Sequence, residues 1–379
     1  MSADHDSQQA RAAASEWADI LRRGARVASA MMAGASDRVA IGTTPKQTVW
    51  RDGKITLSRY EPLADSAPLG PMLILQGLFG RQTVTDLEPD RSLVRRLLAA
   101  GTDLWVIDWG NPSRADCCLD FADYALFSLG DALDQVIAET GRPVALMGIC
   151  QGGVFALCQA ALCPERVSGL ALAVTPVDFH ADLAGPEAQP GLLNTWARNL
   201  PPATIEAFLA EHGLVPGALT GALFQSLMPT RNAAKYGSDL LGIADDPAAL
   251  ATFLRMEAWL SDRPDHPAAA ARQWLIELYQ ENRLVRGRFQ LDGRRVALSA
   301  ITCPILNIVA EQDHIVPPPC ARALAGHTNS DDYRCLDVPT GHIGVFVSAK
   351  AQAIVAPAIA DWLAAAVGDA AHGASLFGK

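Results

Sequence analysis

Positive charge is scarce in this chain of 379 residues, and it is not clustered. The 31 Lys and Arg residues are outnumbered by 41 Asp and Glu residues, and the densest basic stretch, residues 283–295, is interrupted by apolar side chains. A protein that binds nucleic acid uses clustered Lys and Arg to neutralise phosphates. The net charge of -10 therefore leads us to expect no nucleic-acid partner.

The sequence also has no long apolar run and no export signal. A membrane-spanning helix needs about 18 consecutive apolar residues, and no window of the sequence provides them. Residues 1–14 are mostly polar, without the basic start and apolar stretch of an export signal. We expect no membrane span and a cytoplasmic location.

Cysteine is present, but it is not arranged for disulfides or for metal binding. The sequence has eight cysteines and no CxxC pair, and Cys117 directly precedes Cys118. Adjacent cysteines suit neither a zinc site nor an unstrained disulfide. We expect reduced thiols and no metal site.

What the sequence does contain is enough apolar material for a large core. Hydrophobic residues make up 50% of the chain and charged residues 19%, a balance typical of folded globular proteins. Residues 8–34 have the apolar spacing of an amphipathic helix, and we assign residues 1–45 to an N-terminal helical segment. Asp52-Gly53 lies between two short apolar runs, which predicts a β-hairpin.

From residue 71, short apolar runs alternate with helical patterns. Continuous apolar strands between helices indicate a doubly wound, mostly parallel sheet that is buried on both faces. The alternation stops over residues 181–298, which contain helical patterns and prolines but no comparable strand, and then it resumes. We predict a core of residues 46–180 and 299–379, with residues 181–298 inserted as a mostly helical cap.

The most specific motif is Gly148-Ile149-Cys150-Gln151-Gly152, between a predicted strand and a predicted helix. A nucleophile elbow needs this pattern, because a strained turn exposes the nucleophile and the flanking glycines relieve backbone crowding. A helix N-terminus also favours the negative charge of a thiolate. The alternative is a small buried cysteine in a glycine-rich turn without a function. The strand before the motif and the helix after it favour the elbow.

An acid and a base follow in the chain order that such an elbow requires. Asp313 comes just after the predicted strand 305–310, and His342 lies in the loop after the predicted strand 333–338. Because the carboxyl ends of parallel strands share one edge of a sheet, we expect Asp313 to orient His342, and His342 to take the proton of Cys150. The alternatives are an Asp313 that caps a helix and a His342 with a structural role only.

Two backbone N–H groups are expected to stabilise the oxyanion of an acyl-transfer reaction. In this motif they come from the residue after the nucleophile and from the loop after an earlier strand. The corresponding residues are Gln151 and, in the loop Gly77-Leu78-Phe79-Gly80, Leu78. His314, next to Asp313, is an auxiliary candidate for proton transfer, with a structural, hydrogen-bonded histidine as the alternative. Together these elements predict an α/β-hydrolase fold.

At these residues the chain resembles the polyhydroxyalkanoate synthases, and its short length resembles their class III catalytic subunit. The resemblance covers about residues 45 to 365. It includes the Cys-containing box 148–153 and the motifs Gly80-Arg81, Asp90-Arg91-Ser92-Leu93-Val94, Val106-Ile107-Asp108-Trp109-Gly110-Asn111-Pro112, Thr175-Pro176-Val177-Asp178-Phe179, Glu311-Gln312-Asp313-His314-Ile315-Val316-Pro317-Pro318 and Gly341-His342-Ile343-Gly344. In that family the residues that match Cys150, Asp313 and His342 form the catalytic triad, and the cysteine carries the growing chain.

The resemblance implies an acyltransferase that polymerises (R)-3-hydroxyacyl-CoA, with short-chain 3-hydroxybutyryl-CoA favoured, and releases CoA without the help of a cofactor. It implies a second synthase subunit as a partner, a homodimer, and a location at the surface of cytoplasmic polyester granules. Two alternatives stay open. A Cys-dependent thioesterase or polyester depolymerase would use the same triad, and a granule-associated protein could keep the fold without catalysis.

Overall fold

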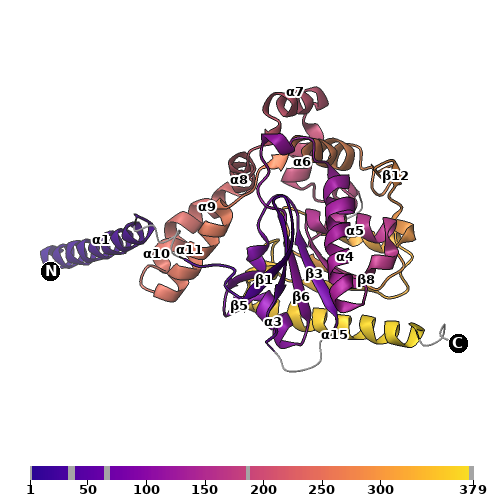
Figure 1. Ribbon diagram of the computed structural model, residues 1–379. Helices are drawn as coiled ribbons and strands as arrows, with labels where there is room; N and C mark the ends of the chain where they lie inside the picture. Colours follow the sequence, from indigo (N-terminus) through magenta and orange to yellow (C-terminus); the bar gives the residue numbers. More distant parts are fainter. Residues whose placement is uncertain (1, 33–38, 64–68, 185–187, 375–379) are drawn as a thin grey trace. The chain divides into compact units, whose positions relative to one another are not determined.

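The computed structural model describes residues 2–32, 39–63, 69–184 and 188–374, which belong to two compact units (Figure 1). The smaller unit comprises Met1–Ile41 and Gly221–Ser261, and the larger comprises Gly42–Thr220 and Asp262–Lys379. The stretch 181–298 is therefore divided between the two units. Its role as a single cap stays a prediction.

The larger unit is built on an eight-stranded sheet with the order β1-β2-β6-β3-β7-β8-β13-β14. The strands are β1 (Lys46–Asp52), β2 (Ile55–Tyr60), β3 (Pro71–Gln76), β6 (Asp103–Asp108), β7 (Val144–Ile149), β8 (Val167–Ala173), β13 (Ile305–Ala310) and β14 (Tyr333–Val338). The β1–β2 and β2–β6 pairs are antiparallel, and the remaining pairs are parallel. The predicted hairpin is present, with Gly53 in the left-handed region at a φ of 54°.

Helices cover both faces of this sheet, as its continuous apolar strands require. Figure 1 shows α4 and α5 on one face and α3 and α15 on the other. On the second face α15 comes so close to β8 that a Cβ on Gly169 would lie 2.8 Å from the Trp362 ring. The bounds are α3 (Leu93–Ala99), the π-helical η3 (Asp123–Ser128), α4 (Leu129–Thr140), α5 (Gln151–Leu162), α13 (Pro318–Arg322), α14 (Gly344–Val347) and α15 (Ala349–Ala374).

The strand order reverses direction at β3, between β6 and β7. The chain passes from β3 to β6 on one side and then returns to β7 on the other side of β3. In an open α/β sheet, ligands bind at such a reversal, outside the carboxyl ends of the strands. The loop after β3 contains Leu78, and Cys150 follows β7 directly.

The insertion between β8 and β13 is mostly helical, as expected. Its elements are α6 (Leu192–Asn199), α7 (Pro202–His212), α8 (Gly217–Ser226), α9 (Pro229–Ala234), η6 (Lys235–Asp239), α10 (Leu240–Gly242), α11 (Pro247–Ser261), α12 (Ala268–Arg272) and η7 (Gln273–Gln280). Two short ribbons were not predicted: β9 (Leu214–Val215) with β10 (His266–Pro267), and β11 (Gln290–Leu291) with β12 (Arg294–Arg295). A third ribbon, β4 (Asp86–Glu88) with β5 (Arg91–Ser92), lies outside the insertion.

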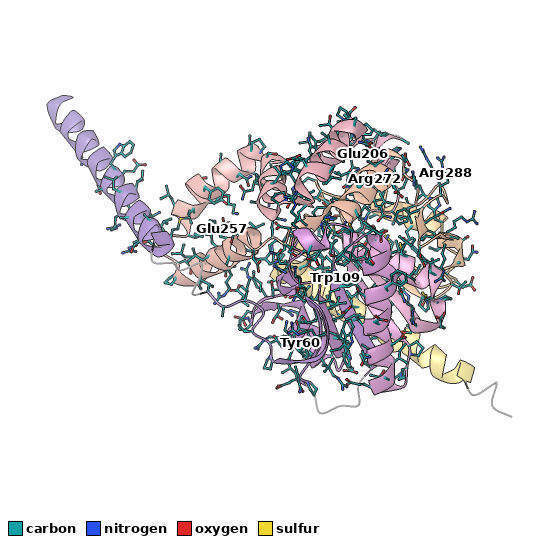
Figure 2. All side chains as sticks on the ribbon, turned by 45° about the horizontal axis from the view of Figure 1, so that its top comes forward. Tyr60, Trp109, Glu206, Glu257, Arg272 and Arg288 are labelled. Carbon is teal, nitrogen blue, oxygen red and sulfur yellow. The ribbon has the colours of Figure 1, made fainter. Side chains whose placement is uncertain are left out.

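Within the larger unit, α7 packs against α12 and η7. A small apolar cluster joins them, and Arg272 Nη2 lies 3.3 Å from Glu206 Oε1 at its edge (Figure 2). The cluster contains Ile205, Leu209, Ala271 and Ile276.

The smaller unit contains α1 (Ser2–Met32) together with α9, η6, α10 and α11. The N-terminal helix begins earlier than the predicted residue 8, and residues 33 and 34 of that prediction lie outside the described residues. Val27 of α1 packs against Leu240 and Ala244, and Arg23 Nε lies 3.0 Å from Asp245 Oδ2. Among the described residues, no helix combines the length and the apolarity that crossing a bilayer requires.

Candidate active site

Cys150 stands at a sharp turn between β7 and α5, with a φ of 53° and a ψ of −120°. A positive φ in a residue other than glycine is strained, and it persists where the surrounding structure enforces it. Here the Cys150 N–H donates to the Ala173 carbonyl at 2.9 Å, and the Cys150 carbonyl accepts from the Gly153 N–H at 3.0 Å. The structure therefore holds Cys150 at the apex of a strand-to-helix turn.

Three glycines around this turn leave no room for a side chain. A Cβ on Gly148 would lie 2.5 Å from the Gly153 Cα, and one on Gly152 would lie 2.4 Å from a carbonyl oxygen of β3. A Cβ on Gly153 would lie 1.9 Å from Thr175 Oγ1. The start of α5 thus lies so close to β3, to β7 and to Thr175 after β8 that only glycine fits at these positions, which explains the sequence pattern.

Asp313 and His342 lie side by side at the carboxyl edge of the sheet, after β13 and β14. His342 Nδ1 donates to Asp313 Oδ2 at 2.7 Å, and both side chains are almost completely buried. The other carboxylate oxygen, Oδ1, accepts two backbone N–H groups of the following turn at 2.8 and 2.9 Å. These bonds fix the carboxylate, and they leave Nε2 as the ring nitrogen of His342 that can face a reacting group.

Two neighbours oppose the effect of burial on His342. Burial disfavours the imidazolium, but the charges of Asp313 and Cys150, together with hydrogen bonds to both, raise the pKa of His342 to about 10. The hydrogen bond to the thiol places the ring beside Cys150. An imidazolium next to a thiolate is the arrangement that activates a cysteine nucleophile. The structure thus brings the three predicted residues together, and their catalytic roles stay a prediction.

Tyr279 also lies near Cys150, and the sequence reasoning did not single it out. It belongs to η7 in the insertion and is 3% exposed. Burial, followed by the nearby charge on Cys150, raises the pKa of its phenol well above the ordinary value. Nothing in the local sequence marks this residue, because its position depends on the path of the whole insertion.

The two predicted oxyanion donors are adjacent, but one of them already has an acceptor. Gln151 is the first residue of α5, so its backbone N–H has no acceptor within the helix. The Leu78 N–H donates to the side-chain oxygen Oε1 of Gln151 at 2.7 Å. The Gln151 amide nitrogen, Nε2, lies 3.2 Å from His266 Nε2. The sequence pattern indicates backbone groups only, and it marks neither the Gln151 side chain nor His266.

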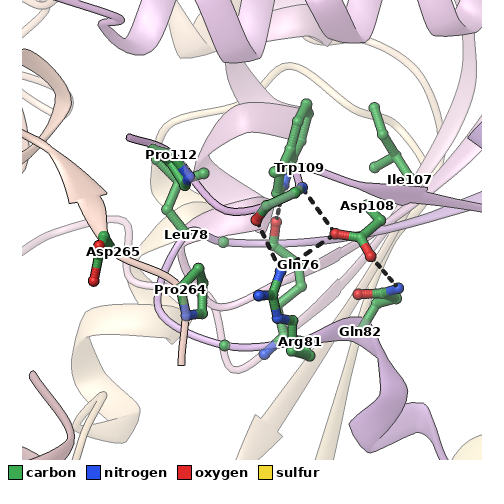
Figure 3. A pocket seen from close by; sticks show the side chains of 13 residues that line it. Gln76, Leu78, Arg81, Gln82, Ile107, Asp108, Trp109, Pro112, Pro264 and Asp265 are labelled. Carbon is green, nitrogen blue, oxygen red and sulfur yellow. Dashed lines mark hydrogen bonds and ion pairs between the residues drawn. The ribbon is translucent and has the colours of Figure 1, made fainter. Parts of the chain in front are cut away.

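A pocket lies beside the Leu78 loop and is lined by several residues of that loop (Figure 3). Arg81 Nη1 donates to the Gly110 carbonyl at 2.8 Å, and Trp109 Nε1 donates to the Gln76 carbonyl at 2.6 Å. These bonds tie the loop to the end of β6. The lining residues are Gln76, Gly77, Leu78, Gly80, Arg81, Gln82, Ile107, Asp108, Trp109, Gly110, Pro112, Pro264 and Asp265.

His314 follows Asp313 in the loop after β13 and is half-buried. The contacts that join Cys150, His342 and Asp313 do not involve it, and its auxiliary role stays a prediction. Across the described ranges, the structure contains no cluster of three or more His, Cys, Asp and Glu side chains that could hold a metal ion.

Comparison with known sequences relates the chain to a group of polymerases. Residues 70–349 match the family model of the alpha/beta hydrolase fold. The chain is 40% identical over 332 residues to the poly(3-hydroxyalkanoate) polymerase subunit PhaC of Allochromatium vinosum, and the match covers 86% of this chain and 90% of that protein. It is 38% identical over 333 residues to the protein of the same name from Synechocystis sp., with 86% of each chain covered.

Among solved structures, MenH from S. aureus is similar in fold. It has a TM-score of 0.52 and 17% sequence identity, and the match covers 82% of this chain and 98% of that one. Together with the mostly parallel sheet, these matches confirm the predicted α/β-hydrolase fold.

Proposed function

Since the chain belongs to the family of poly(3-hydroxyalkanoate) polymerase subunits PhaC, we propose that it polymerises (R)-3-hydroxyacyl-CoA through an acyl intermediate on Cys150 and releases CoA. The family consists of acyltransferases, and the chain is accordingly an enzyme that makes polyhydroxyalkanoate. We propose in particular that the substrate is the short 3-hydroxybutyryl-CoA, that the acyl group is held as a thioester on Cys150, and that CoA is released.

One observation carries this proposal: Cys150 sits in a strained strand-to-helix turn beside a His342 ring that Asp313 holds at 2.7 Å. A thiol in this setting suits an acyl group that must stay reactive. Moving the acyl group from the CoA thiol to another thiol exchanges one thioester for another, which is nearly neutral in free energy. A serine in the same place would form a more stable ester.

In the first step the Cys150 thiolate attacks the carbonyl carbon of the hydroxyacyl-CoA. A bond forms between Sγ and the acyl carbon, and the bond from that carbon to the CoA sulfur breaks. His342, whose raised pKa favours the imidazolium, gives its proton to the departing CoA thiolate. The products are an acylated Cys150, a neutral His342 and free CoA.

In the second step the hydroxyl group of the next monomer attacks the same acyl carbon. His342 accepts the hydroxyl proton, an ester bond forms, and the bond to Cys150 breaks. The product is a longer acyl-CoA, which can acylate the free thiol again. The first step leaves His342 without its second proton, and Asp313, 2.7 Å from its Nδ1, holds the ring in place as the general base for the alcohol.

We also propose that the insertion, residues 181–298, acts as a cap over this chemistry. Two of its residues support this role, because Tyr279 lies near Cys150 and His266 lies within hydrogen-bond distance of Gln151. A cover of this kind keeps water away from the thioester, which would otherwise be hydrolysed.

The experiment that tests the function is incubation of the purified chain with 3-hydroxybutyryl-CoA, with Cys150→Ala as the control. The proposal predicts polymer together with CoA, and slower turnover of longer 3-hydroxyacyl-CoA substrates. Free 3-hydroxybutyrate with CoA would instead identify a thioesterase. Unchanged substrate, also after a candidate second subunit is added, would contradict catalysis by this chain.

The assembly forms a further part of the proposal. The relatives are named as subunits, which supports a second synthase subunit as partner. We propose that the chain also forms a homodimer, needs no cofactor and acts at the surface of cytoplasmic polyester granules. Trp17 and Leu21 on α1 are 65% and 69% exposed, which leaves apolar surface for association. Light scattering should give a dimeric mass, and the chain should sediment with polyester particles; a monomer that stays in the supernatant would contradict this.

A further inference from the structure

The side chain of Gln151 occupies the hydrogen-bond donor that the oxyanion is expected to use. The Leu78 N–H donates to Gln151 Oε1 at 2.7 Å, and both residues are buried. A backbone N–H carries one proton, so it cannot stabilise an acyl oxygen fully while it makes this bond. The contact depends on Gly77, because a Cβ there would lie 2.5 Å from the Gln151 Cβ and 2.9 Å from its Oε1.

His266 holds the other end of the Gln151 amide. Its Nδ1 lies 3.2 Å from the Pro267 carbonyl oxygen, which can only accept a hydrogen bond, so Nδ1 carries the proton. Burial lowers the pKa of His266 to about 4, against a smaller effect of the Pro267 hydrogen bond, so the ring is neutral. Its Nε2 then accepts from Gln151 Nε2 at 3.2 Å. This fixes the orientation of the amide, with Oε1 directed at Leu78.

The segment that carries His266 also clamps the Leu78 loop directly. The ring of His266 lies 4.7 Å from the ring of Phe79, centroid to centroid. Arg263 Nη1, three residues earlier, donates to the Phe79 carbonyl at 2.9 Å. Residues 263–267 of the insertion therefore contact the Phe79 ring, the Phe79 carbonyl and the Gln151 amide. Pro264 and Asp265 of this segment also line the pocket beside the loop (Figure 3).

We propose that the Gln151 carboxamide acts as an internal substitute for the acyl oxygen of the substrate. In the resting enzyme the carboxamide accepts the hydrogen bond of the Leu78 N–H, and it must release this N–H before acylation. In this proposal, which rests on the proposed acyl transfer at Cys150, His266 is the positioning residue that holds the amide in place. The arrangement satisfies a buried N–H that would otherwise cost free energy in the empty site. It also makes oxyanion stabilisation depend on the insertion, since Gln151 is released when His266 moves away.

The first test replaces Gln151 with alanine and measures single-turnover acylation. We expect Gln151→Ala to acylate about three- to tenfold faster than the wild type at low substrate concentration, the factor that one internal hydrogen bond contributes. Alkylation of Cys150 by iodoacetamide, which forms no oxyanion, should change less than about twofold. The matched control is Gln159→Ala, which removes a buried glutamine about 12 Å further along α5 and should change neither rate.

A slower or an unchanged acylation rate in Gln151→Ala would overturn the proposal. A slower rate would mean that the amide supports the Leu78 loop, and an unchanged rate would mean that the amide does not affect oxyanion binding. Failure of the proposed function has a different signature. In that case the wild type releases no CoA from 3-hydroxybutyryl-CoA, and the ratio of variant to wild type can still be measured with a p-nitrophenyl ester that acylates Cys150.

The second test concerns His266. We expect His266→Ala to accelerate acylation as Gln151→Ala does, and His266→Asn, which retains an acceptor for the amide, to return the rate toward wild type. In the Gln151→Ala background, His266→Ala should have no further effect, since there is no amide left to hold. Additive effects of the two substitutions would overturn the role of His266. Because His266→Ala is the variant at risk of misfolding, the His266→Asn and Gln151→Ala measurements keep this role testable.

Discussion

The two sides of the active site use their hydrogen bonds differently. On the acid–base side, Asp313 holds the His342 ring at 2.7 Å, and the ring is hydrogen-bonded to Cys150. On the oxyanion side, the Leu78 N–H donates to the Gln151 side chain at 2.7 Å. The first side is ready for reaction as it stands. The second must exchange an internal acceptor for the substrate.

This difference separates two kinds of contribution to catalysis. Groups that are already oriented lower the barrier without rearrangement, so their removal should cost most of the activity. A donor that is covered in the resting state contributes only after the covering group leaves, so changes around it should tune the rate. Substitutions on the acid–base side should therefore cause large losses of rate. Substitutions on the oxyanion side should cause smaller changes, and some of them should raise the rate instead of lowering it.

The largest effect is expected from removal of the nucleophile itself. Cys150→Ser should lower polymerisation by at least about 10³-fold, because an alkoxide is much harder to form than a thiolate and an oxygen ester is less reactive. Thermal melting should match the wild type, since Ser fits the same turn. Polymer formed by Cys150→Ser at near the wild-type rate would show that Cys150 does not carry the chain.

The next largest effect should follow from loss of the carboxylate that orients His342. Asp313→Asn should slow steady-state polymerisation by about 10²- to 10⁴-fold, because the amide favours the wrong tautomer of the imidazole. First acylation should suffer less, since a thiol ionises far more readily than the alcohol of the second step. Single-turnover CoA release and steady-state polymer formation, measured side by side, check this. Equal losses in both would remove the reason for linking Asp313 to activation of the alcohol.

A smaller effect is expected on the oxyanion side from Gly77→Ala. The new Cβ would lie 2.5 Å from the Gln151 Cβ, so the loop that carries Leu78 must shift. Misplacing one oxyanion donor should slow acylation by about 10²-fold and leave iodoacetamide alkylation of Cys150 nearly unchanged.

The matched control for Gly77→Ala is Gly326→Ala, where a Cβ meets no atom within 4 Å. It should acylate at the wild-type rate. If Gly77→Ala acylates as fast as Gly326→Ala, the Leu78 loop is not part of the oxyanion site.

The smallest expected effect is on the pH dependence of stability. The pKa of His342 is raised to about 10 in the folded chain, above the reference value of about 6.5. This stabilisation is complete below a pH of about 6.5, and it is lost as the pH rises toward 10. Urea midpoints should therefore fall over this range, and they should fall less in Asp313→Asn, which lacks the partner charge. The exposed Asp337 offers the control, because in Asp337→Asn the urea midpoint should fall with pH as steeply as in the wild type. If the midpoint of Asp313→Asn falls equally steeply, Asp313 is not the cause of the raised pKa of His342.

How well the sequence predicted the molecule depends on whether the information was local. The strands 305–310 and 333–338 were predicted with the bounds that the structure has. The first is an almost entirely apolar run, which marks a strand buried on both faces. The second lies at the end of the sheet order, and it is only partly buried. The turn at Cys150 was predicted for a similar reason. The close approach of α5 to β3, to β7 and to Thr175 admits only glycine at positions 148, 152 and 153, and these three positions lie within six residues of sequence.

The parts of the site that escaped prediction depend on contacts between segments far apart in the sequence. His266 reaches Gln151 across 115 residues of sequence, and no local pattern announces that contact. Tyr279 lies in a π-helical segment whose apolar spacing looks like that of an ordinary core helix. Gln151 was assigned a backbone role only, since the direction of its side chain follows from the space left by Gly77.

The most direct test of the account is to identify the residue that carries the acyl chain. The enzyme would be mixed with 3-hydroxybutyryl-CoA, quenched with acid within one turnover, digested and analysed by mass spectrometry. We predict one or more 3-hydroxybutyryl units on the peptide that contains Cys150, and none on that peptide in Cys150→Ser. Polymer formation with an unmodified Cys150 at every time point, or with the acyl units on another residue, would contradict the account.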